Sequence, residues 1–308
     1  MNILLAGGSG TVGRNLINYL LERYPSYHLV NFDRQDWELG RKQYTFIKGD
    51  IRREELVEKT IKEHEIQTVI NLAHENKSGI QQIETNFCGH YVLLNKSHQA
   101  RIKKFIHLSS DVIYSTTAEA ALNKPAVETD PVSAANMDSA GRIGAEALSL
   151  AYYKTYQLPV TILRPASILG PHLKPDNLIS LFISSALKND PLPIYHEGQS
   201  SQDWLYASDL CLAIDKVLHN KKVEGEIFNL GLGIKHSILD TAKLILVNLD
   251  KPESLLRFME EKTPLFSRPA LNIDKAKRLL GWEPQIGFNE ALKRTIDYHV
   301  SSTKSPTQ

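Results

Sequence analysis

Apolar residues in the first half of the chain fall into short, uninterrupted runs that are separated by amphipathic stretches. The runs have the length of buried β-strands, and the stretches between them repeat apolar residues at helical spacing. Strands are predicted at residues 2–6, 28–33, 44–48, 68–72, 104–108 and 159–165. Helices are predicted between them, the two longest at residues 83–100 and 136–156. This alternation predicts an α/β fold with a Rossmann-type, doubly wound parallel sheet.

The regular alternation ends near residue 172, beyond which several prolines interrupt the chain. We expect residues 1–172 to form the Rossmann domain, and a strand near residues 225–231 to return to its sheet. Residues 173–300 are expected to form mainly a smaller carboxyl-terminal α/β lobe that binds the substrate. Residues 301–308 are polar and are predicted to be a disordered tail.

Three glycines follow the first predicted strand at once and lead into a helix. Gly7, Gly10 and Gly13 allow a tight turn, a close approach of the backbone to a pyrophosphate, and close packing of the helix on the strand. The N–H groups at the start of that helix favour an anion. The second strand ends on Asp33, whose carboxylate can accept hydrogen bonds from ribose hydroxyls. The order of these features predicts a dinucleotide-binding site: a strand, the three glycines, a helix, and a second strand that ends on an acidic residue.

The residues at the end of the second strand bear on which dinucleotide binds. Asp33 would repel a 2′-phosphate, so NAD is favoured. The neighbouring Arg34 could pair with such a phosphate, and NADP therefore remains possible.

Composition narrows the class of protein further. The chain has 308 residues, 42% of them hydrophobic, and a formal net charge of +1, which gives no bias towards nucleic acid or an anionic membrane. Cys88 and Cys211 lie far apart and form no metal-binding motif or disulfide framework. The first strand begins at residue 2, and no apolar run is long enough to span a bilayer. We therefore expect a cytoplasmic protein without a bound metal.

A series of short motifs resembles the extended short-chain dehydrogenase/reductase family, which contains NAD-dependent nucleotide-sugar epimerases, dehydratases and reductases. Beside the glycines and Asp33, the motifs are Gly49–Ile51, Asn71–Ala73, Thr85-Asn86, Ser109–Tyr114, Arg164-Pro165, Gly170-Pro171, Asp203–Tyr206 with Asp209, and Leu280–Pro284. The resemblance runs from about residue 2 to residue 298. It implies an enzyme that carries out epimerase- or reductase-like oxidoreduction on a nucleotide-activated sugar. It also implies a homodimer, built on the helices at 83–100 and 136–156.

The resemblance further assigns roles to single residues. Residues implied to bind the cofactor, beside the glycines, are Thr11, Val12, Asp33, Arg34, Asp50, Ile51, Leu72, Ala73 and Arg142. Residues implied to face the substrate are Glu75, Asn177, Gln202 and Arg268. Ser110 would hydrogen-bond the reacting sugar oxygen. Asp111 matches one acid of the dehydratases, but Val112 stands where they have a glutamate, so a dehydratase is disfavoured.

The departure from the family lies in its catalytic tyrosine and lysine, which this chain replaces by Asp138 and Arg142. The two residues can be an ion pair on a helix face, worth a few tenths of a kcal/mol. They can be a substituted catalytic pair, or hydride chemistry can have been lost. A carboxylate beside a guanidinium has a lowered pKa and is a poor base for an alcohol, which argues against the substituted pair. His74 after the fourth strand is another candidate, as a proton shuttle or as a rim residue.

A second interpretation of the whole chain stays open for these reasons. The chain can be a catalytically impaired member that binds NAD, and a sugar nucleotide, as a non-catalytic partner or regulatory subunit. Asp138 and Arg142 favour this interpretation, whereas Ser110 and the well-preserved second lobe favour the enzyme.

Overall fold

The strands predicted from the apolar runs form one seven-stranded parallel sheet. The computed structural model describes residues 1–75, 79–116, 123–260 and 267–304, with side chains described as far as Ser302. The order of the strands is β11-β6-β5-β4-β1-β2-β3. Their bounds are Asn2–Ala6 (β1), His28–Asp33 (β2), Tyr44–Lys48 (β3), Thr68–Asn71 (β4), Lys104–Leu108 (β5), Val160–Pro165 (β6) and Ile227–Leu230 (β11). The predicted α/β fold of the Rossmann type is confirmed, and so is the late strand that returns to the sheet.

The sheet places its ligand site by its connectivity. β1 pairs in parallel with both β2 and β4, so the order of the strands reverses on either side of it. In such sheets ligands bind outside the carboxyl ends of the strands at the reversal. The residues that follow β1, β2, β4 and β5 therefore meet at one edge.

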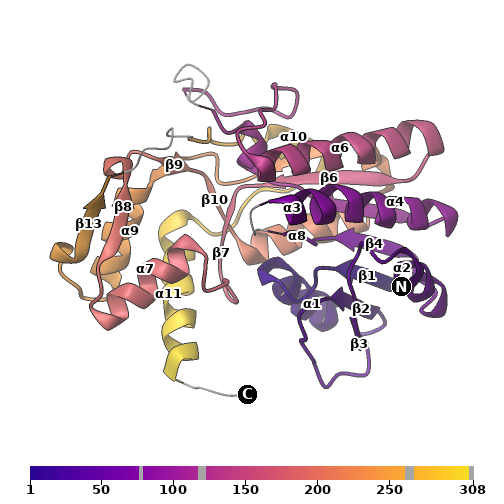
Figure 1. Cartoon of the computed structure of the whole chain (residues 1–308), viewed down its shortest axis with the longest axis horizontal. Helices are drawn as coiled ribbons and strands as arrows, with labels where there is room; N and C mark the ends of the chain where they lie inside the picture. Colours follow the sequence, from indigo (N-terminus) through magenta and orange to yellow (C-terminus); the bar gives the residue numbers. More distant parts are fainter. Residues whose placement is uncertain (76–78, 117–122, 261–266, 305–308) are drawn as a thin grey trace.

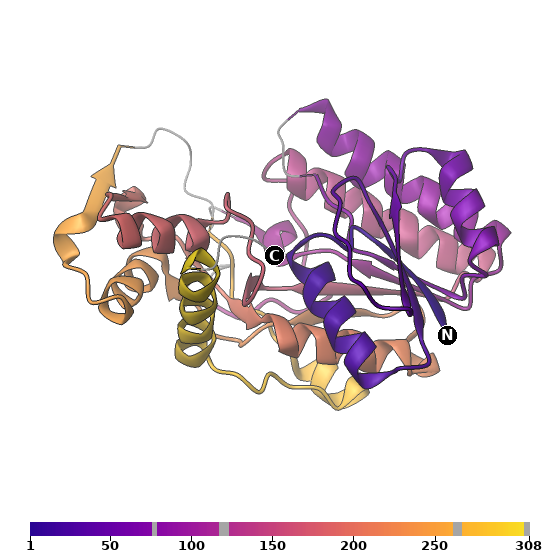
Figure 2. The ribbon, with the colours of Figure 1, turned by 90° about the horizontal axis from the view of Figure 1, so that it is seen from below.

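Helices cover both faces of this sheet (Figures 1 and 2). One face packs on α1 (Thr11–Arg23), α8 (Ala207–Leu218) and α10 (Asp274–Leu280); the other packs on α2 (Glu54–Glu63), α4 (His90–Gln99) and α6 (Met137–Tyr156). Successive side chains of a strand point to opposite faces, which is why Ile3 and Leu5 belong to the first core and Leu4 to the second.

The carboxyl-terminal half builds a second lobe with its own core (Figure 1). Its helices are α7 (Leu178–Lys188), α9 (Ile238–Asn248) and α11 (Phe288–Lys304). Its paired strands are β7 (Ser167–Leu169) with β10 (Trp204–Tyr206), β8 (Leu192–Tyr195) with β13 (Leu256–Met259), and β9 (Ser201–Gln202) with β12 (His236–Ser237). Phe182, Trp204 and Ile245 are buried in this core. α8, α10 and β11 pack on the main sheet instead, so the division near residue 172 stays a prediction.

Short helical turns complete the described chain. They are α3 (Ile80–Ile83), a π-helical turn η1 (Glu84–Gly89), and the 3₁₀ turns η2 (Asp111–Tyr114), η3 (His196–Gly198), η4 (Lys221–Val223) and η5 (Glu253–Leu255). In the described ranges, no helix is both long and apolar enough to cross a membrane.

Two predicted elements differ from the structure. The helix predicted at 83–100 starts earlier, at Ile80, and consists of α3, the π-helical turn η1 and α4, which ends at Gln99. Gln82 in the added turn is polar in the sequence but buried in the structure. The tail predicted from residue 301 is helical as far as Lys304, because α11 continues past the polar residues; the Ser301 and Ser302 hydroxyls donate to Tyr298 O and His299 O. Residues 305–308 lie outside the described residues.

Candidate active site

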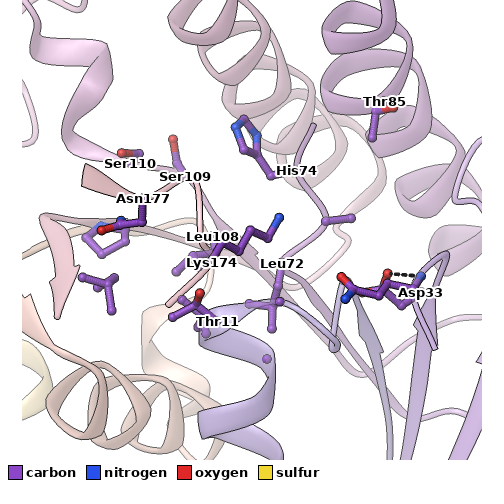
Figure 3. A pocket seen from close by; sticks show the side chains of 18 of the residues that line it. Thr11, Asp33, Leu72, His74, Thr85, Leu108, Ser109, Ser110, Lys174 and Asn177 are labelled. Carbon is purple, nitrogen blue, oxygen red and sulfur yellow. Dashed lines mark hydrogen bonds between the residues drawn. The ribbon is translucent and has the colours of Figure 1, made fainter. Parts of the chain in front are cut away.

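A cavity of about 610 Å³ lies at the carboxyl edge of the main sheet, where the second lobe meets it. Residues that follow β1, β2, β3, β4 and β5 contribute to its walls, together with Lys174 and residues 176–178 at the start of α7. Figure 3 shows Thr11 at the start of α1, Leu72 and His74 after β4, and Lys174 and Asn177 from the second lobe. The cavity thus brings together segments from both halves of the chain.

The glycine turn after β1 leaves room for the phosphate groups of a ligand. Gly7 has φ 83°, and a Cβ there would lie 2.6 Å from Ala73 N. A Cβ on Gly13 would lie 2.3 Å from Gly8 O, so the helix can approach the turn only with glycine at this position. A Cβ on Gly10 would meet only Gly7 O within 4 Å, at 3.4 Å, so the space beside this cavity-lining glycine is open. The cradle therefore fits a pyrophosphate.

The start of α1 adds donors to this cradle. Gly10 is its N-cap and makes no side-chain capping bond, so the first N–H groups of the helix remain available to an anion. Thr11 and Val12, in the first turn, line the cavity.

Asp33 and Arg34 lie at the end of β2, where a ribose was predicted. Asp33 accepts hydrogen bonds from Ser9 N and Gln35 N, both at 2.9 Å, which fixes its carboxylate at the cavity wall. Arg34 also lines the cavity, but its Nη2 lies 2.8 Å from the buried carboxylate of Glu75. Glu75, which was predicted to face the substrate, is held in this ion pair and is not among the residues that line the cavity.

The far wall carries the residues predicted to flank an adenine. Asp50 and Ile51 line the cavity, as do Leu72 and Ala73 after β4. Asp50 binds Arg52 (2.7 Å from Oδ2 to Nη2), which keeps its carboxylate in place at the rim.

Asp138 and Arg142 form the ion pair that the helical spacing predicts. Arg142 Nε donates to Asp138 Oδ1 at 3.0 Å, and His74 Nε2 lies 3.1 Å from the same oxygen. Burial acts to raise the pKa of Asp138, but the hydrogen bond from His74 and the charge of Arg142 outweigh it and bring that pKa to about 2. His74 and Arg142 line the cavity, whereas Asp138 is not among its lining residues.

Ser110 and Asp111 follow β5 at the start of η2. Ser110 lines the cavity; its hydroxyl donates to Asp111 Oδ1 (3.0 Å) and accepts from Val112 N (3.3 Å). Asp111 is buried, and its Oδ1 also accepts from Arg268 Nη1 at 2.8 Å. The predicted phosphate ligand Arg268 is therefore bound to the predicted acid Asp111.

The second lobe supplies fewer of the predicted contacts. Asn177 lines the cavity and caps α7 by accepting from Ile179 N at 2.9 Å. Gln202 is buried on β9 and is not among the lining residues.

Several lining residues were not predicted from the sequence as site residues. The polar or charged ones among them are Gln35, Thr85, Ser109, Ser167, Lys174 and Asp176. The sequence could have indicated Ser109 and Thr85, because both belong to motifs of the family resemblance. In the structure their hydroxyls are buried, and no described residue hydrogen-bonds them. Lys174 and Asp176 are single charged residues in a loop beside Pro175, and their sequence carries no such signal.

Comparison with known proteins agrees with this geometry. Residues 3–231 match the NAD dependent epimerase/dehydratase family. Low-salt glycan biosynthesis protein Agl12 of Haloferax volcanii is 31% identical over 97% of this chain and 99% of its own. Human dTDP-D-glucose 4,6-dehydratase is 29% identical over 96% of this chain and 89% of its own. The crystal structure of dTDP-glucose 4,6-dehydratase from Bacillus anthracis in complex with NAD is 31% identical, with a TM-score of 0.91 over 99% of this chain and 98% of the other. The chain belongs to the NAD dependent epimerase/dehydratase family, and the cofactor of that family fits the glycine turn and Asp33.

Proposed function

We propose that this enzyme oxidises or reduces a ring carbon of a nucleotide-activated sugar with NAD, in an epimerase- or reductase-like reaction. The observation that carries the proposal is the single cavity that joins the glycine turn and Asp33 to Ser110 and to Asn177 of the second lobe. Similar proteins named as dTDP-glucose 4,6-dehydratases support a sugar nucleotide as the substrate class.

The cofactor is proposed to lie along the wall made by the first four strands. Gly7, Gly10 and Gly13, with Thr11 and Val12, would hold the pyrophosphate. Asp33 would accept the adenosine ribose hydroxyls, with Arg34 beside it. Asp50 and Ile51 would flank the adenine. Leu72, Ala73 and Arg142 would contact the rest of the cofactor. The support is that all of these residues line the cavity.

The sugar is proposed to lie beside Ser110, with its nucleotide towards the second lobe. Ser110 would hydrogen-bond the reacting oxygen, since its hydroxyl lies at the cavity wall. Asn177 would contact the nucleotide half. Arg268 and Gln202 would reach the substrate only after a rearrangement, because Arg268 is bound to Asp111 and Gln202 is buried.

Elimination of water is not part of the proposed reaction. A dehydratase needs an acid pair after the fifth strand, and this chain has Val112 beside Asp111. Asp111 Oδ1 already accepts hydrogen bonds from Arg268 Nη1 and from the Ser110 hydroxyl, so this oxygen is engaged within the protein.

Binding and turnover can be tested together. The protein is incubated with NAD and with dTDP-glucose or UDP-glucose; absorbance at 340 nm reports bound NADH, and NMR of the sugar identifies an epimer or a keto sugar. We expect NAD to bind and the sugar to be converted without loss of water. Binding of NAD and sugar nucleotide with no conversion would instead favour the non-catalytic partner. A 4-keto-6-deoxy product would show a dehydratase.

A homodimer and a cytoplasmic location are proposed as well. The exposed side of α4 and α6 carries Tyr91, Tyr152 and Tyr156 around a hollow, with Tyr91 46% and Tyr156 51% exposed. Large aromatic side chains left partly exposed on neighbouring helices suit a contact with a second copy. Cys88 and Cys211 are free thiols, as is usual in a reducing compartment.

A further inference from the structure

The cavity is bordered by a cluster of three titratable or charged side chains where the family resemblance implies a tyrosine and a lysine. Asp138 and Arg142 belong to the first two turns of α6, and His74 follows β4. Arg142 Nε and His74 Nε2 both contact Asp138 Oδ1, at 3.0 and 3.1 Å. One carboxylate oxygen thus ties a helix to the loop after a neighbouring strand.

Asp138 is unsuited to accept a proton from an alcohol. Two donors stabilise its ionised form, and its pKa of about 2 lies far below that of a sugar hydroxyl. Asp138 also stands behind the cavity wall, since His74 and Arg142 line the cavity and Asp138 does not. What the carboxylate can do from this position is fix the orientation of the imidazole.

His74 brings an acceptor to the cavity. Its Nε2 faces Asp138, and no described residue bonds its Nδ1. A neutral imidazole that donates from Nε2 to a carboxylate carries its lone pair on Nδ1. Figure 3 shows the His74 ring on the same side of the cavity as Ser109 and Ser110. The residue proposed to bind the sugar oxygen and an imidazole acceptor therefore border one space.

We propose that His74 takes the place of the missing phenol as the group that accepts and returns the proton of the sugar hydroxyl, and that Asp138, held by Arg142, is a positioning residue for its ring. The inference rests on the proposed function. The O–H bond of the substrate breaks and its proton passes to Nδ1. The carbon that bears this oxygen loses a hydride, for which bound NAD would be the acceptor. Loss of one proton and one hydride balances the oxidation of the alcohol to the ketone. In the reverse direction His74 returns the proton to the oxygen.

The charges around His74 suit this role. Asp138 and Arg142 face it from α6, Lys174 from the loop before α7, and His107 from β5. Burial lowers the pKa of His74, and Arg142 and Lys174 lower it further, while Asp138 opposes them. The ring is therefore neutral near pH 7, and Asp138 stabilises the imidazolium once a proton has been taken up.

The first test removes the ring. The NAD-loaded full-length protein is mixed with dTDP-glucose or UDP-glucose, and reduction of bound NAD is followed in a single turnover. His74→Ala should lower the rate about 100-fold. Added imidazole should restore part of the rate in His74→Ala, because it can occupy the vacated space. The matched control His64→Ala, at the end of α2 and outside the residues that line the cavity, should keep the wild-type rate.

The second test separates positioning from catalysis and has a readout that does not depend on turnover. The pKa of His74 is measured by NMR in the wild type and in Asp138→Asn. Because Asp138 raises the pKa of His74, its replacement should lower that pKa further. The rising limb of the pH–rate profile should shift to lower pH by the same amount, and imidazole should not rescue Asp138→Asn.

The outcomes distinguish the two proposals. If the wild type reduces bound NAD and His74→Ala does so within about twofold, or is not rescued by imidazole, the role of His74 is wrong while the proposed function stands. An unchanged His74 pKa in Asp138→Asn overturns the positioning role. If the wild type binds NAD and both sugar nucleotides but reduces no NAD, the proposed function fails, and the role of His74 fails with it.

Discussion

Arg34 and Glu75 form an ion pair, with 2.8 Å between Nη2 and Oε2, that joins the carboxyl ends of β2 and β4. The Glu75 side chain is only 9% exposed, whereas that of Arg34 is 49% exposed. The guanidinium beside Asp33 is therefore held by a buried carboxylate, and turning it towards a 2′-phosphate would break this pair. The residue that made NADP possible in the sequence is thus committed to another partner.

This ion pair predicts how cofactor preference can be changed. The wild type should bind NAD more tightly than NADP by titration calorimetry. Glu75→Gln removes the charge that holds Arg34, so the ratio of the two affinities should move towards NADP by about 10-fold, equivalent to about 1.4 kcal/mol. Glu84→Gln, which alters an exposed partner of Arg52, is the control and should leave the ratio unchanged. An unchanged ratio in Glu75→Gln would mean that the pair does not control the choice.

Replacement of Asp203, which does not line the cavity, is expected to lower the stability of the protein strongly. Its two carboxylate oxygens accept hydrogen bonds from the backbone N–H groups of Trp204, Leu232, Gly233 and Leu271, at 2.7 to 3.1 Å. Asp203→Asn turns an NH₂ group towards two of these donors. We expect a loss of about 2–4 kcal/mol in the free energy of unfolding, measured with urea. Asp190→Asn, at an exposed position, should change it by less than about 0.5 kcal/mol; a similar small loss at Asp203 would contradict the prediction.

The part of the cavity wall where the cofactor is proposed to bind could be predicted because its determinants are local. Gly7, Gly10 and Gly13 act through the backbone of one turn, and Asp33 ends the next strand along the sheet. Strand ends of a parallel sheet meet at one edge whatever the details of packing. The residues lining the cavity on this side therefore include all those that the sequence indicated.

The other half depends on contacts between distant segments. His74 follows β4 and Asp138 lies in α6, so the two meet only in the folded chain, and Arg268 meets Asp111 because the chain returns from the second lobe. Helical spacing predicted the pair of Asp138 with Arg142, but nothing local indicates the third partner of that carboxylate. Lys174 enters the cavity from the second lobe, whose position no pattern in the sequence fixes.

The proposed dimer predicts that charge on the aromatic side of α4 and α6 separates the subunits. Tyr156→Glu places a carboxylate beside Tyr152, where a partner would take its charge out of water. The dimer should then dissociate at micromolar concentration, as measured by sedimentation velocity. Tyr195→Glu is the matched control, since Tyr195 is 45% exposed on the second lobe. A wild type that sediments as a monomer would exclude this dimer.

The last prediction concerns two buried histidines behind the site. His90 and His107 have ring centroids 4.2 Å apart; His90 bonds Asn71 and Ser149, whereas no described residue bonds either nitrogen of His107. Burial lowers the pKa of His90 to about 3 and that of His107 well below 6.5, and the charge of His90 adds to the effect on His107.

The sign of the pH dependence follows from these lowered pKa values. Below pH 6.5 the unfolded chain binds protons at both rings while the folded protein does not, so stability is fully present above pH 6.5 and falls as the pH decreases. Each ring contributes a slope of about 1.4 kcal/mol per pH unit to the free energy of unfolding.

The variant His107→Phe keeps an aromatic ring beside His90, but this ring cannot be protonated. Urea unfolding at pH 5.0, 5.5 and 7.5 should therefore show a slope shallower by about 1.4 kcal/mol per pH unit, with little loss of stability at pH 7.5, because no hydrogen bond to a described residue is removed. His98→Phe, on the partly exposed surface of α4, should keep the wild-type slope. If His107→Phe keeps it too, His107 is protonated inside the folded protein and is not a source of its sensitivity to acid.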